Sequence, residues 1–426
     1  MKRIIALIVC LMLCLAVLSG CTTLPALGLQ SMLRDSAQKN TGAQMGEAGG
    51  DYVSISLEEY ERYKKYDTLL EIMAIVEENY YEDTDESAML DGAAMGMLSA
   101  IGDPYTFYYT AEEFSEMWED DEGEYAGVGI LISADYTTGL CSAIRVFTGS
   151  PAEKAGVLRG DILYKVEDLY VTADNLQDAV DIMRGTPGTD VHVTFLRDGE
   201  ERETVMTRAV VNVNRVESCM LENEIGYIYL YEFAGDCAEK FKAAAEELAA
   251  QGAKGFIIDL RDNPGGWVND AEAIGDLFLD EGLLYYVEYK DGTRDNTYTK
   301  EGKMDLPLVI LVNENSASSS EILTGALKER AGATVVGVQS YGKGIIQAVT
   351  PVGSEGAGMQ LTIAQYYTPN GNKVHKIGIT PDVEVRLPED DPGIYEFADL
   401  NDPQLNKAFE VMKEKLEKTE SEIPAA

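Results

Sequence analysis

A serine-rich turn between an apolar run and a helical pattern is the part of the chain best suited to chemistry. The apolar run at 306–312 is short and rich in branched residues, which is typical of a buried strand. The turn at 316–320 follows it, and from Glu321 the apolar residues recur at helical spacing. A serine at such a turn is exposed, and the backbone N–H groups that begin the helix point at whatever it attacks.

Further along, two polar residues follow a second predicted strand at 334–338. Lys343 lies between two glycines, and Gln347 lies in a third predicted strand at 345–349. The two residues are four apart, so on an extended chain both side chains project from the same face. The sequence therefore predicts an amine and an amide on one face of a strand.

The run S-A-S-S-S-E-I, followed by Y-G-K-G-I-I-Q, resembles the carboxyl-terminal processing protease family. Those serine endopeptidases use a serine–lysine pair instead of a serine–histidine–aspartate triad. The resemblance implies that Ser318 is the nucleophile, Lys343 the general base and Gln347 the residue that orients the lysine. Taken singly, the two runs are no more than a loop and a turn, but both within one unit favour the catalytic interpretation.

A lysine base must be uncharged to accept a proton. Free lysine, with a pKa of about 10.4, is almost wholly protonated at neutral pH, so Lys343 is expected in a dry pocket without a carboxylate partner. Gln347 would hold the amine through a neutral hydrogen bond. Glu321, three residues after Ser318, could spoil this arrangement, and we expect it on the outer side of the helix or capping backbone amides.

The chain has only two histidines, so few residues could act as a histidine base. His192 lies in a strand-like alternation and is interpreted as structural, and His375 has no acidic partner nearby in the sequence. A histidine triad stays open as an alternative, but no spacing favours it.

The run D-L-R-D-N-P-G-G after the predicted strand at 255–260 resembles a second motif of the same family. Pro-Gly-Gly before a predicted helix at 271–279 frees backbone N–H groups, which suits an oxyanion hole. We assign the hole to the amide of Gly265 or Gly266 together with that of Ser319; the alternative is a plain tight turn.

Residues 1–20 have the pattern of a lipoprotein signal peptide. A basic pair precedes an apolar core that is too short for a good membrane span, and L-S-G-C resembles a bacterial lipobox ending at Cys21. We expect cleavage before Cys21 and a lipid on its sulfur, which would anchor the protein extracytoplasmically on the bacterial cell membrane. A plain secretion signal and a signal anchor are the alternatives.

The remaining chain divides by composition and motif. We predict a flexible tether at 21–50, a helical region at 51–123, a PDZ domain at 124–213, a protease core at 214–400, and a C-terminal helix and tail at 401–426. The resemblance implies a multidomain α/β fold with an N-terminal helical arm, a β-rich PDZ domain with helices, and a crotonase/ClpP-like α/β core.

The PDZ resemblance rests on G-V-G, S-P-A-E-K-A-G and G-D in the usual order. It implies a groove where an extended peptide adds a strand, with its terminal carboxylate held by the loop Gly127, Val128, Gly129 and Ile130. The two glycines would let the backbone approach the carboxylate. The basic residue usual after Ala-Gly-hydrophobic is replaced by Leu158, with Arg159 one place later.

A capping box at Ser56 and Glu59 opens a predicted long helix, whose apolar stripe includes Leu69, Ile72 and Val76. A second helix is predicted at 87–101, and these helices would serve as a packing arm or as the arms of a homodimer. The family's Asp-Pro is followed by histidine and serine, where this chain has Tyr105 and Thr106. We interpret that departure as one of packing more than of chemistry.

The composition of the chain limits the classes of molecule that it is expected to bind. The chain has 74 acidic and 34 basic residues and a net charge of −40, which argues against nucleic acid. No nucleotide loop or metal-ligand pattern occurs, so no cofactor and no metal are expected. Protein or peptide substrates with free C-termini are the expected partners. The rival hypotheses are a catalytically silent peptide-binding scaffold, and a penicillin-binding type of serine enzyme, whose companion motifs are missing.

Overall fold

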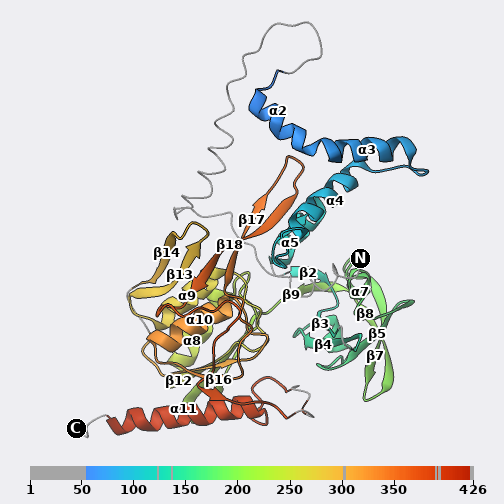
Figure 1. Cartoon of the computed structure of the whole chain (residues 1–426). Helices are drawn as coiled ribbons and strands as arrows, with labels where there is room; N and C mark the ends of the chain where they lie inside the picture. The colour runs from blue at the N-terminus through green and yellow to red at the C-terminus, as the bar shows by residue number, and fades with distance from the viewer. Residues whose placement is uncertain are drawn as a thin grey trace. The chain divides into compact units, whose positions relative to one another are not determined.

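The computed structural model describes residues 54–121, 124–135, 138–300, 304–388, 391 and 395–422. These residues form a helical unit that ends at Gly102 and a larger unit that begins at Asp103 (Figure 1). The predicted signal peptide, Cys21 and the predicted tether lie outside the described residues. Within the described residues, no helix combines the length and apolarity needed to cross a bilayer.

The helical unit contains α2 (Leu57–Tyr63), the 3₁₀ turn η2 (Lys64–Tyr66), α3 (Asp67–Asn79) and α4 (Glu86–Ser99). The capping box is confirmed, because Ser56 Oγ accepts from the N–H of Glu59 at 3.2 Å and Glu59 Oε2 accepts from the N–H of Ser56 at 2.8 Å. The prediction of one long helix is wrong, since η2 interrupts it. None of the residues in α2, α3 or α4 is buried, so their apolar side chains remain largely exposed.

The core of the larger unit is a six-stranded sheet of order β10-β11-β12-β15-β16-β19. Its strands are β10 (Val216–Leu221), β11 (Ile225–Leu230), β12 (Gly255–Asp259), β15 (Leu308–Val312), β16 (Thr334–Gly337) and β19 (Val383–Glu384). Only β10 is antiparallel to its neighbour. Every residue of β12 and β15 is buried, as expected for parallel strands covered on both faces.

Alternate residues of these strands face opposite layers of helices. Phe256, Ile258 and Ile310 belong to the apolar cluster formed with α8 (Cys237–Ala250), α9 (Val268–Phe278) and α10 (Ser319–Arg330). Ile257 and Val309 belong to the cluster formed with α11 (Pro403–Glu422). Figure 1 shows α11 on one side of the sheet and α8 to α10 on the other. Because of this period-two alternation, the sheet presents apolar side chains to the helices on both of its faces.

Three neighbouring parallel strands lead into the three candidate motifs. Parallel strands end at the same edge of a sheet, so the chain segments that follow β12, β15 and β16 emerge side by side. Those segments contain Gly265, Ser318 and Lys343 respectively. The sheet topology therefore brings together residues that are widely separated in sequence.

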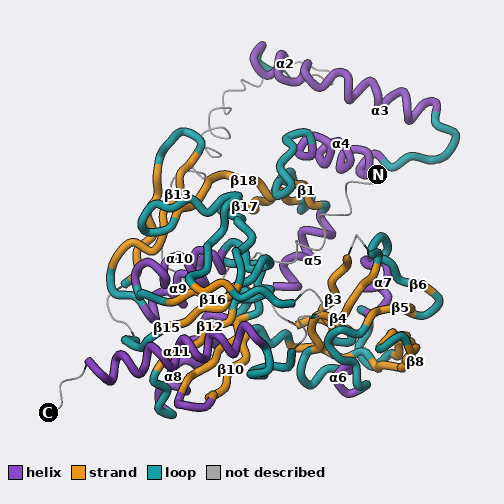
Figure 2. The backbone as a smooth tube through the Cα atoms, turned by 60° about the horizontal axis from the view of Figure 1, so that its bottom comes forward, coloured by secondary structure: helices purple, strands orange, loops and turns teal. Residues whose placement is uncertain are grey.

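A second, antiparallel sheet of order β1-β18-β13-β14 lies in the same unit, with β17 paired to β18 (Figure 2). The strands are β1 (Phe107–Tyr109), β13 (Gly282–Tyr289), β14 (Arg294–Thr299), β17 (Ile345–Pro351) and β18 (Gly358–Tyr367), and α5 (Ala111–Asp121) follows β1. This sheet contains Gln347 on β17 and places β1 beside β18.

Residues from β2 to β9 form the β-rich part of the larger unit. The main sheet has the order β3-β4-β5-β7-β8, with β6 on β5, and β2 pairs with β9. The elements are β2 (Glu124–Gly127), β3 (Ile130–Asp135), β4 (Leu140–Val146), α6 (Pro151–Lys154), β5 (Ile162–Val166), β6 (Leu169–Tyr170), α7 (Leu176–Met183), β7 (Asp190–Arg197), β8 (Glu200–Thr207) and β9 (Ala209–Asn212). Their apolar side chains form a cluster of their own, separate from the core clusters of the six-stranded sheet.

Candidate active site

Ser318 lies at the junction between the β15 turn and α10, in a backbone conformation that side chains rarely adopt. Its φ is +56° and its ψ −117°, and the residue is only 8% exposed. Gly265 packs directly against it, because a Cβ on Gly265 would lie 2.6 Å from the Cβ of Ser318 and 2.9 Å from the nitrogen of Ser319. The nucleophile candidate is therefore held against the Pro-Gly-Gly turn.

Glu321 connects the serine turn to the lysine turn. Its Oε2 accepts hydrogen bonds from the backbone N–H groups of Ser318 and Lys343, each at 2.9 Å. Its Oε1 accepts from the N–H of Gly342 at 2.7 Å and from the hydroxyl of Ser340 at 2.6 Å. Two backbone nitrogens bonded to one oxygen are separated by no more than the two bond lengths together. One carboxylate thus holds the backbones of the candidate nucleophile and the candidate base side by side.

The structure corrects one alternative for Glu321 and bears out the other. The side chain is 1% exposed, so it does not lie on the outer side of the helix, but it does cap backbone amides. Burial raises the pKa of this carboxyl, and the hydrogen bonds from Ser340, Gly342 and Ser318 act in the opposite direction. Four N–H and O–H groups donate to the two oxygens of Glu321. These hydrogen bonds favour the ionised form of the carboxyl.

Lys343 is half-buried, and its amine lies over an aromatic ring. The Nζ atom is 4.8 Å from the ring centroid of Tyr105, which is itself half-buried. The interpretation of Tyr105 as a change of packing more than of chemistry stays a prediction, although its ring lies beside the candidate base.

The position of Gln347 is set by the pairing of β17 with β18. Lys343 precedes β17, and the pairing of β17 with β18 shifts register between Ile346 and Gln347. The extra residue of this irregularity, Ile363, lies on β18, so the alternation of side chains along β17 is kept, and a shared face for Lys343 and Gln347 stays a prediction. The Nε2 of Gln347 donates to Thr362 Oγ1 on β18 at 3.3 Å, which leaves the carbonyl oxygen as the acceptor it can offer to an amine.

The two glycine amides considered for the oxyanion hole are not equivalent. The N–H of Gly265 donates to Asn263 Oδ1 at 2.9 Å within the turn. Within the described part of the chain, the N–H groups of Gly266 and Ser319 have no acceptor. The geometry therefore favours Gly266 over Gly265 as the donor that acts with Ser319.

Asn263 is a supporting residue that the sequence analysis missed. Its side chain is fully buried and donates to Leu230 O at 2.7 Å. Its backbone carbonyl accepts from Ala317 N–H at 3.0 Å and from Ser320 Oγ at 2.9 Å. These bonds join the Pro-Gly-Gly turn to the serine turn. An asparagine directly before proline in the motif was the available signal.

Tyr366 is a second missed support. Its hydroxyl donates to the carbonyl of Ser318 at 3.0 Å and lies 3.4 Å from Glu321 Oε2. Burial raises the pKa of this phenol well above its usual range, so the hydroxyl keeps its proton and stays a donor. The backbone of Ser318 is thus held on its N–H side by Glu321 and on its carbonyl side by Tyr366.

Comparisons with known proteins agree with this geometry. The Peptidase family S41 model matches residues 224–385, the PDZ domain model residues 145–197, and the model of the activating protease CtpB N-terminal domain residues 29–113. The carboxy-terminal-processing protease of Bartonella bacilliformis is 33% identical over 341 residues, which is 78% of this chain and 77% of that protein. The chain belongs to the carboxy-terminal processing proteases of peptidase family S41.

Other members of the family are similarly close. The carboxy-terminal processing protease CtpA of Bacillus subtilis is 34% identical over 76% of this chain and 70% of its own length. The solved structure of the photosystem II D1 C-terminal processing protease superposes with a TM-score of 0.55 and 27% identity, covering 82% of this chain and 96% of that one. The chain is therefore a C-terminal processing serine protease with a PDZ domain, and the predicted family, fold class and enzyme class are confirmed.

In this processing protease, the predicted peptide loop of the PDZ domain links β2 to β3. Val128 is buried, and Gly129 has a φ of +84°. A Cβ on Gly129 would lie 2.3 Å from the Cβ of Ser150, and one on Gly127 would lie 2.8 Å from the ring of Tyr125. The domain's own packing thus requires both glycines, which is a different reason from the close approach of a ligand. Ile130 opens β3, the end strand of its sheet.

Arg159, one place later than the usual basic residue, contacts the protease core. Its guanidinium lies 3.6 Å from Asp262 in the turn that precedes Gly265. Arg145 of β4 lies over the ring of Tyr231 at 3.3 Å, and Tyr231 stacks on Tyr229 at 4.1 Å. The hydroxyl of Tyr229 donates to Arg261 O at 2.8 Å. The PDZ domain of this protease therefore touches the turn that bears the candidate oxyanion donors.

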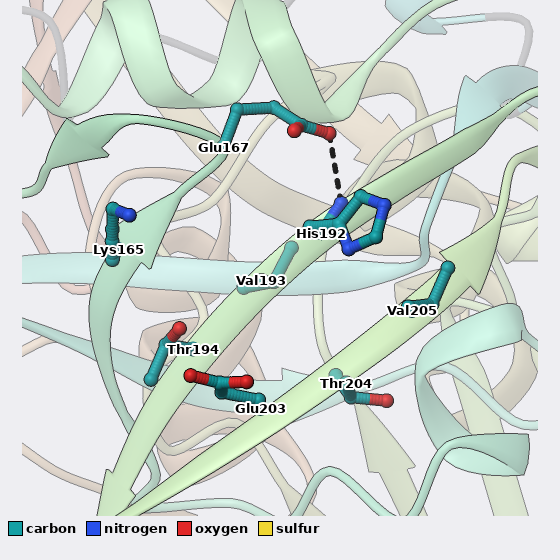
Figure 3. Close-up of a pocket in the computed structure, with 8 residues that line it drawn as sticks. All are labelled: Lys165, Glu167, His192, Val193, Thr194, Glu203, Thr204 and Val205. Atoms are coloured by element: carbon teal, nitrogen blue, oxygen red, sulfur yellow. Dashed lines mark hydrogen bonds between the residues drawn. The ribbon is translucent and has the colours of Figure 1, made fainter.

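A polar hollow elsewhere on the PDZ domain contains none of the predicted site residues (Figure 3). It is lined by Lys165, Glu167, His192, Val193, Thr194, Glu203, Thr204 and Val205. The carboxylate of Glu167 accepts from the backbone N–H of His192 at 2.9 Å. The His192 side chain is exposed, so the residue is not part of the core. Within the described residues, no cluster of three or more candidate metal ligands occurs.

Proposed function

We propose that this protein is a membrane-tethered, extracytoplasmic endopeptidase that cleaves near substrate C-termini with Ser318, Lys343 and Gln347. The single observation that carries the catalytic assignment is the Glu321 oxygen shared by the N–H groups of Ser318 and Lys343. That bond pair supports a serine–lysine site because it holds the backbones of two turns that are remote in sequence next to the same oxygen.

The proposed chemistry follows acyl transfer. Neutral Lys343 Nζ takes the proton of Ser318 Oγ as this oxygen attacks the peptide carbonyl, and the N–H groups of Gly266 and Ser319 stabilise the oxyanion. The lysine ammonium then gives its proton to the leaving amine, and the C–N bond breaks. Water, deprotonated by the same amine, hydrolyses the ester and restores Ser318. Gln347 orients the amine without adding charge.

Digestion of casein by four variants tests the assignment. Ser318→Ala and Lys343→Ala are expected to lose at least about a thousandfold in kcat, as for other nucleophile–base pairs. Ser354→Ala and Lys373→Ala remove exposed residues of the same types and are expected to retain wild-type rates. Activity retained by either of the first two variants would contradict the serine–lysine site.

PDZ-gated substrate access is supported by two contacts. Arg159 pairs with Asp262, and the stacked path from Arg145 ends at Arg261, directly before Asp262. A peptide C-terminus bound beside β3 would thus act on a domain that touches the oxyanion turn. Removing the last residues of a model substrate should raise KM for the wild type. An unchanged cleavage rate would count against gating.

Lipid anchoring through Cys21 is supported by the L-S-G-C run after an apolar core. Labelled palmitate should enter the wild type and not Cys21→Ala when the full chain is expressed in a bacterium. External protease should degrade the protein on intact cells. Label in the Cys21→Ala protein would refute the site.

A homodimer through the helical arms is supported by the exposed apolar side chains of α2 to α4, including Leu70, Ile72 and Ile75. Sedimentation of the full chain should give a dimer that the double change Ile72→Ser and Ile75→Ser dissociates. Identical sedimentation of the two proteins would remove this surface as the interface.

A further inference from the structure

Tyr105 makes two contacts with the turn that bears the catalytic lysine. Its ring centroid lies 4.8 Å from Lys343 Nζ, and its hydroxyl donates to the hydroxyl of Tyr341 at 3.1 Å. Tyr341 is two residues before Lys343, and its N–H donates to Ser316 O at 3.0 Å. One aromatic side chain therefore contacts both the amine and the side chain of Tyr341 in the same turn.

The backbone of Tyr105 is fixed from both sides. Its N–H donates to Asp103 Oδ1 at 3.1 Å, and its carbonyl accepts from Gln360 Nε2 at 3.1 Å. Asp103 Oδ2 in turn accepts from Thr106 Oγ1 at 2.6 Å. A surface aromatic would be free to turn away, whereas this one is positioned by side chains at its own segment and on β18.

The supports of Tyr105 and of Gln347 meet on a single residue. The N–H of Thr362 donates to Thr106 Oγ1 at 3.1 Å, and Thr362 Oγ1 accepts from Gln347 Nε2 at 3.3 Å. Strand β18 thus holds the residues proposed to flank the amine, the glutamine directly and the tyrosine through its neighbour.

An aromatic face beside an amine has two opposing effects. The negative face of the ring attracts the ammonium form, and the same ring excludes water, which favours the neutral form. A leucine at this position would still exclude water from the amine but would not attract the ammonium form. An alanine would do neither. These two substitutions therefore separate the effects.

We propose that Tyr105 is a positioning residue for the general base: its ring holds the Lys343 amine beside the serine turn and sets the pH at which that amine can accept a proton. The proposal rests on Lys343 being the base. The hydrogen bond from the Tyr105 hydroxyl to Tyr341 contributes only to the placement of the ring, since it is the ring of Tyr105 that lies over the amine.

Other groups near the lysine turn titrate or carry charge. On the elements packed against this turn they are Glu321 of α10, Asp103 before β1, Tyr341 in the turn itself, Tyr366 of β18, and His375 and Lys376 in the segment after β18. Of these groups, Tyr341 loses a side-chain hydrogen bond when position 105 is changed, and the Tyr105→Phe and Tyr341→Phe variants measure that loss separately from the effect of the ring.

The test measures kcat and KM of the full chain on fluorescent casein from about pH 6 to 10, for the wild type and three variants. Tyr105→Leu should move the acid limb of kcat to lower pH by roughly half a unit, the size expected for a cation–π contact. Tyr105→Ala should move the limb to higher pH, because water reaches the amine. Tyr105→Phe should keep the wild-type limb and lower kcat several-fold.

Tyr341→Phe is the matched control, because it removes the same hydroxyl bond from the exposed side. It should reproduce the kcat of Tyr105→Phe with an unshifted limb. Superimposable limbs for the wild type, Tyr105→Leu and Tyr105→Ala would overturn the proposal and leave Tyr105 a packing residue. An active Lys343→Ala variant would instead refute the base assignment itself, so the two failures are distinguishable.

Discussion

Glu321 illustrates how a single residue organises this site. A glutamine has the same shape, but its NH₂ group would face at least one backbone N–H donor, so at least one of the four short hydrogen bonds would be lost. Glu321→Gln is therefore expected to reduce kcat more than about a hundredfold and to lower the free energy of unfolding by roughly 3 kcal/mol. Casein turnover and urea unfolding measure the two effects.

Glu329→Gln is the control on the same helix. Glu329 accepts from Thr368, Asn370 and Asn372, away from the serine turn. Its loss should destabilise the fold and leave kcat near the wild-type value. Equal kcat for the two glutamine variants would mean that Glu321 has only a structural role.

His375 gives the fold a pH dependence. Burial lowers the pKa of this histidine, with Lys376 and Lys373 acting in the same direction. Because the unfolded chain then binds the proton more readily, the stability is fully present above the ordinary pKa of about 6.5 and falls as the pH drops below it. Urea unfolding at about pH 7 and pH 5.5 should show a smaller difference for His375→Asn than for the wild type. His192→Asn, with an exposed side chain, should behave as the wild type, and an equal response of both variants would contradict the assignment.

At this scale the sequence predicted residue types better than contacts. The spacing and motifs predicted roles for Ser318 and Lys343, and the backbone N–H groups of these two residues share one oxygen of Glu321. The Tyr105 contact could not be predicted, because it depends on the pairing of β1 with β18, across a long separation in sequence. The register shift before Gln347 is likewise invisible in a one-dimensional spacing rule.

At the scale of elements, the start of α11 is joined to the oxyanion turn by a buried ion pair. Arg261 binds Asp259 and Asp402, with both closest approaches at 2.6 Å, and its carbonyl is held by Tyr229. Asp402 also caps α11 through the N–H of Gln404 at 2.8 Å. Removing one partner leaves buried charge uncompensated.

Asp402→Ala is accordingly expected to cost about 3 to 5 kcal/mol of stability and to reduce kcat, because Arg261 adjoins the Asp262–Gly266 turn. Unfolding and casein turnover, below the melting transition, test both effects. Lys407→Ala on the exposed face of α11 is the matched change and should alter neither by much. A stable, fully active Asp402→Ala protein would separate α11 from the site.

The sequence predicted elements well where a single apolar pattern decided them. The predicted helix at 271–279 overlaps α9 (Val268–Phe278), since its apolar face packs on a sheet already specified by buried strands. The long N-terminal helix failed because no core selects its conformation, and η2 interrupts it. Most of the fold class was thus predictable, and the breaks within it were not.

At the scale of the whole molecule, the chain carries a net charge of −40. Such a field attracts basic substrates and is screened by salt. We expect kcat/KM for a lysine-rich peptide to fall up to about tenfold between about 20 and 500 mM NaCl, with kcat unchanged. An acidic peptide of the same length should show the opposite trend. Parallel responses of the two peptides would exclude long-range steering.

The positive φ of Ser318 has a thermal consequence. Glycine adopts such a conformation without steric cost, whereas serine and alanine both meet it, by about 1 kcal/mol or more. Ser318→Gly should therefore melt at a higher temperature than Ser318→Ala, although both lack the hydroxyl. On the proposed mechanism hydrolysis requires serine at this position, although the backbone conformation favours glycine. A lineage that abandoned hydrolysis would be free to drift to glycine here, and would become more heat-tolerant as it did so.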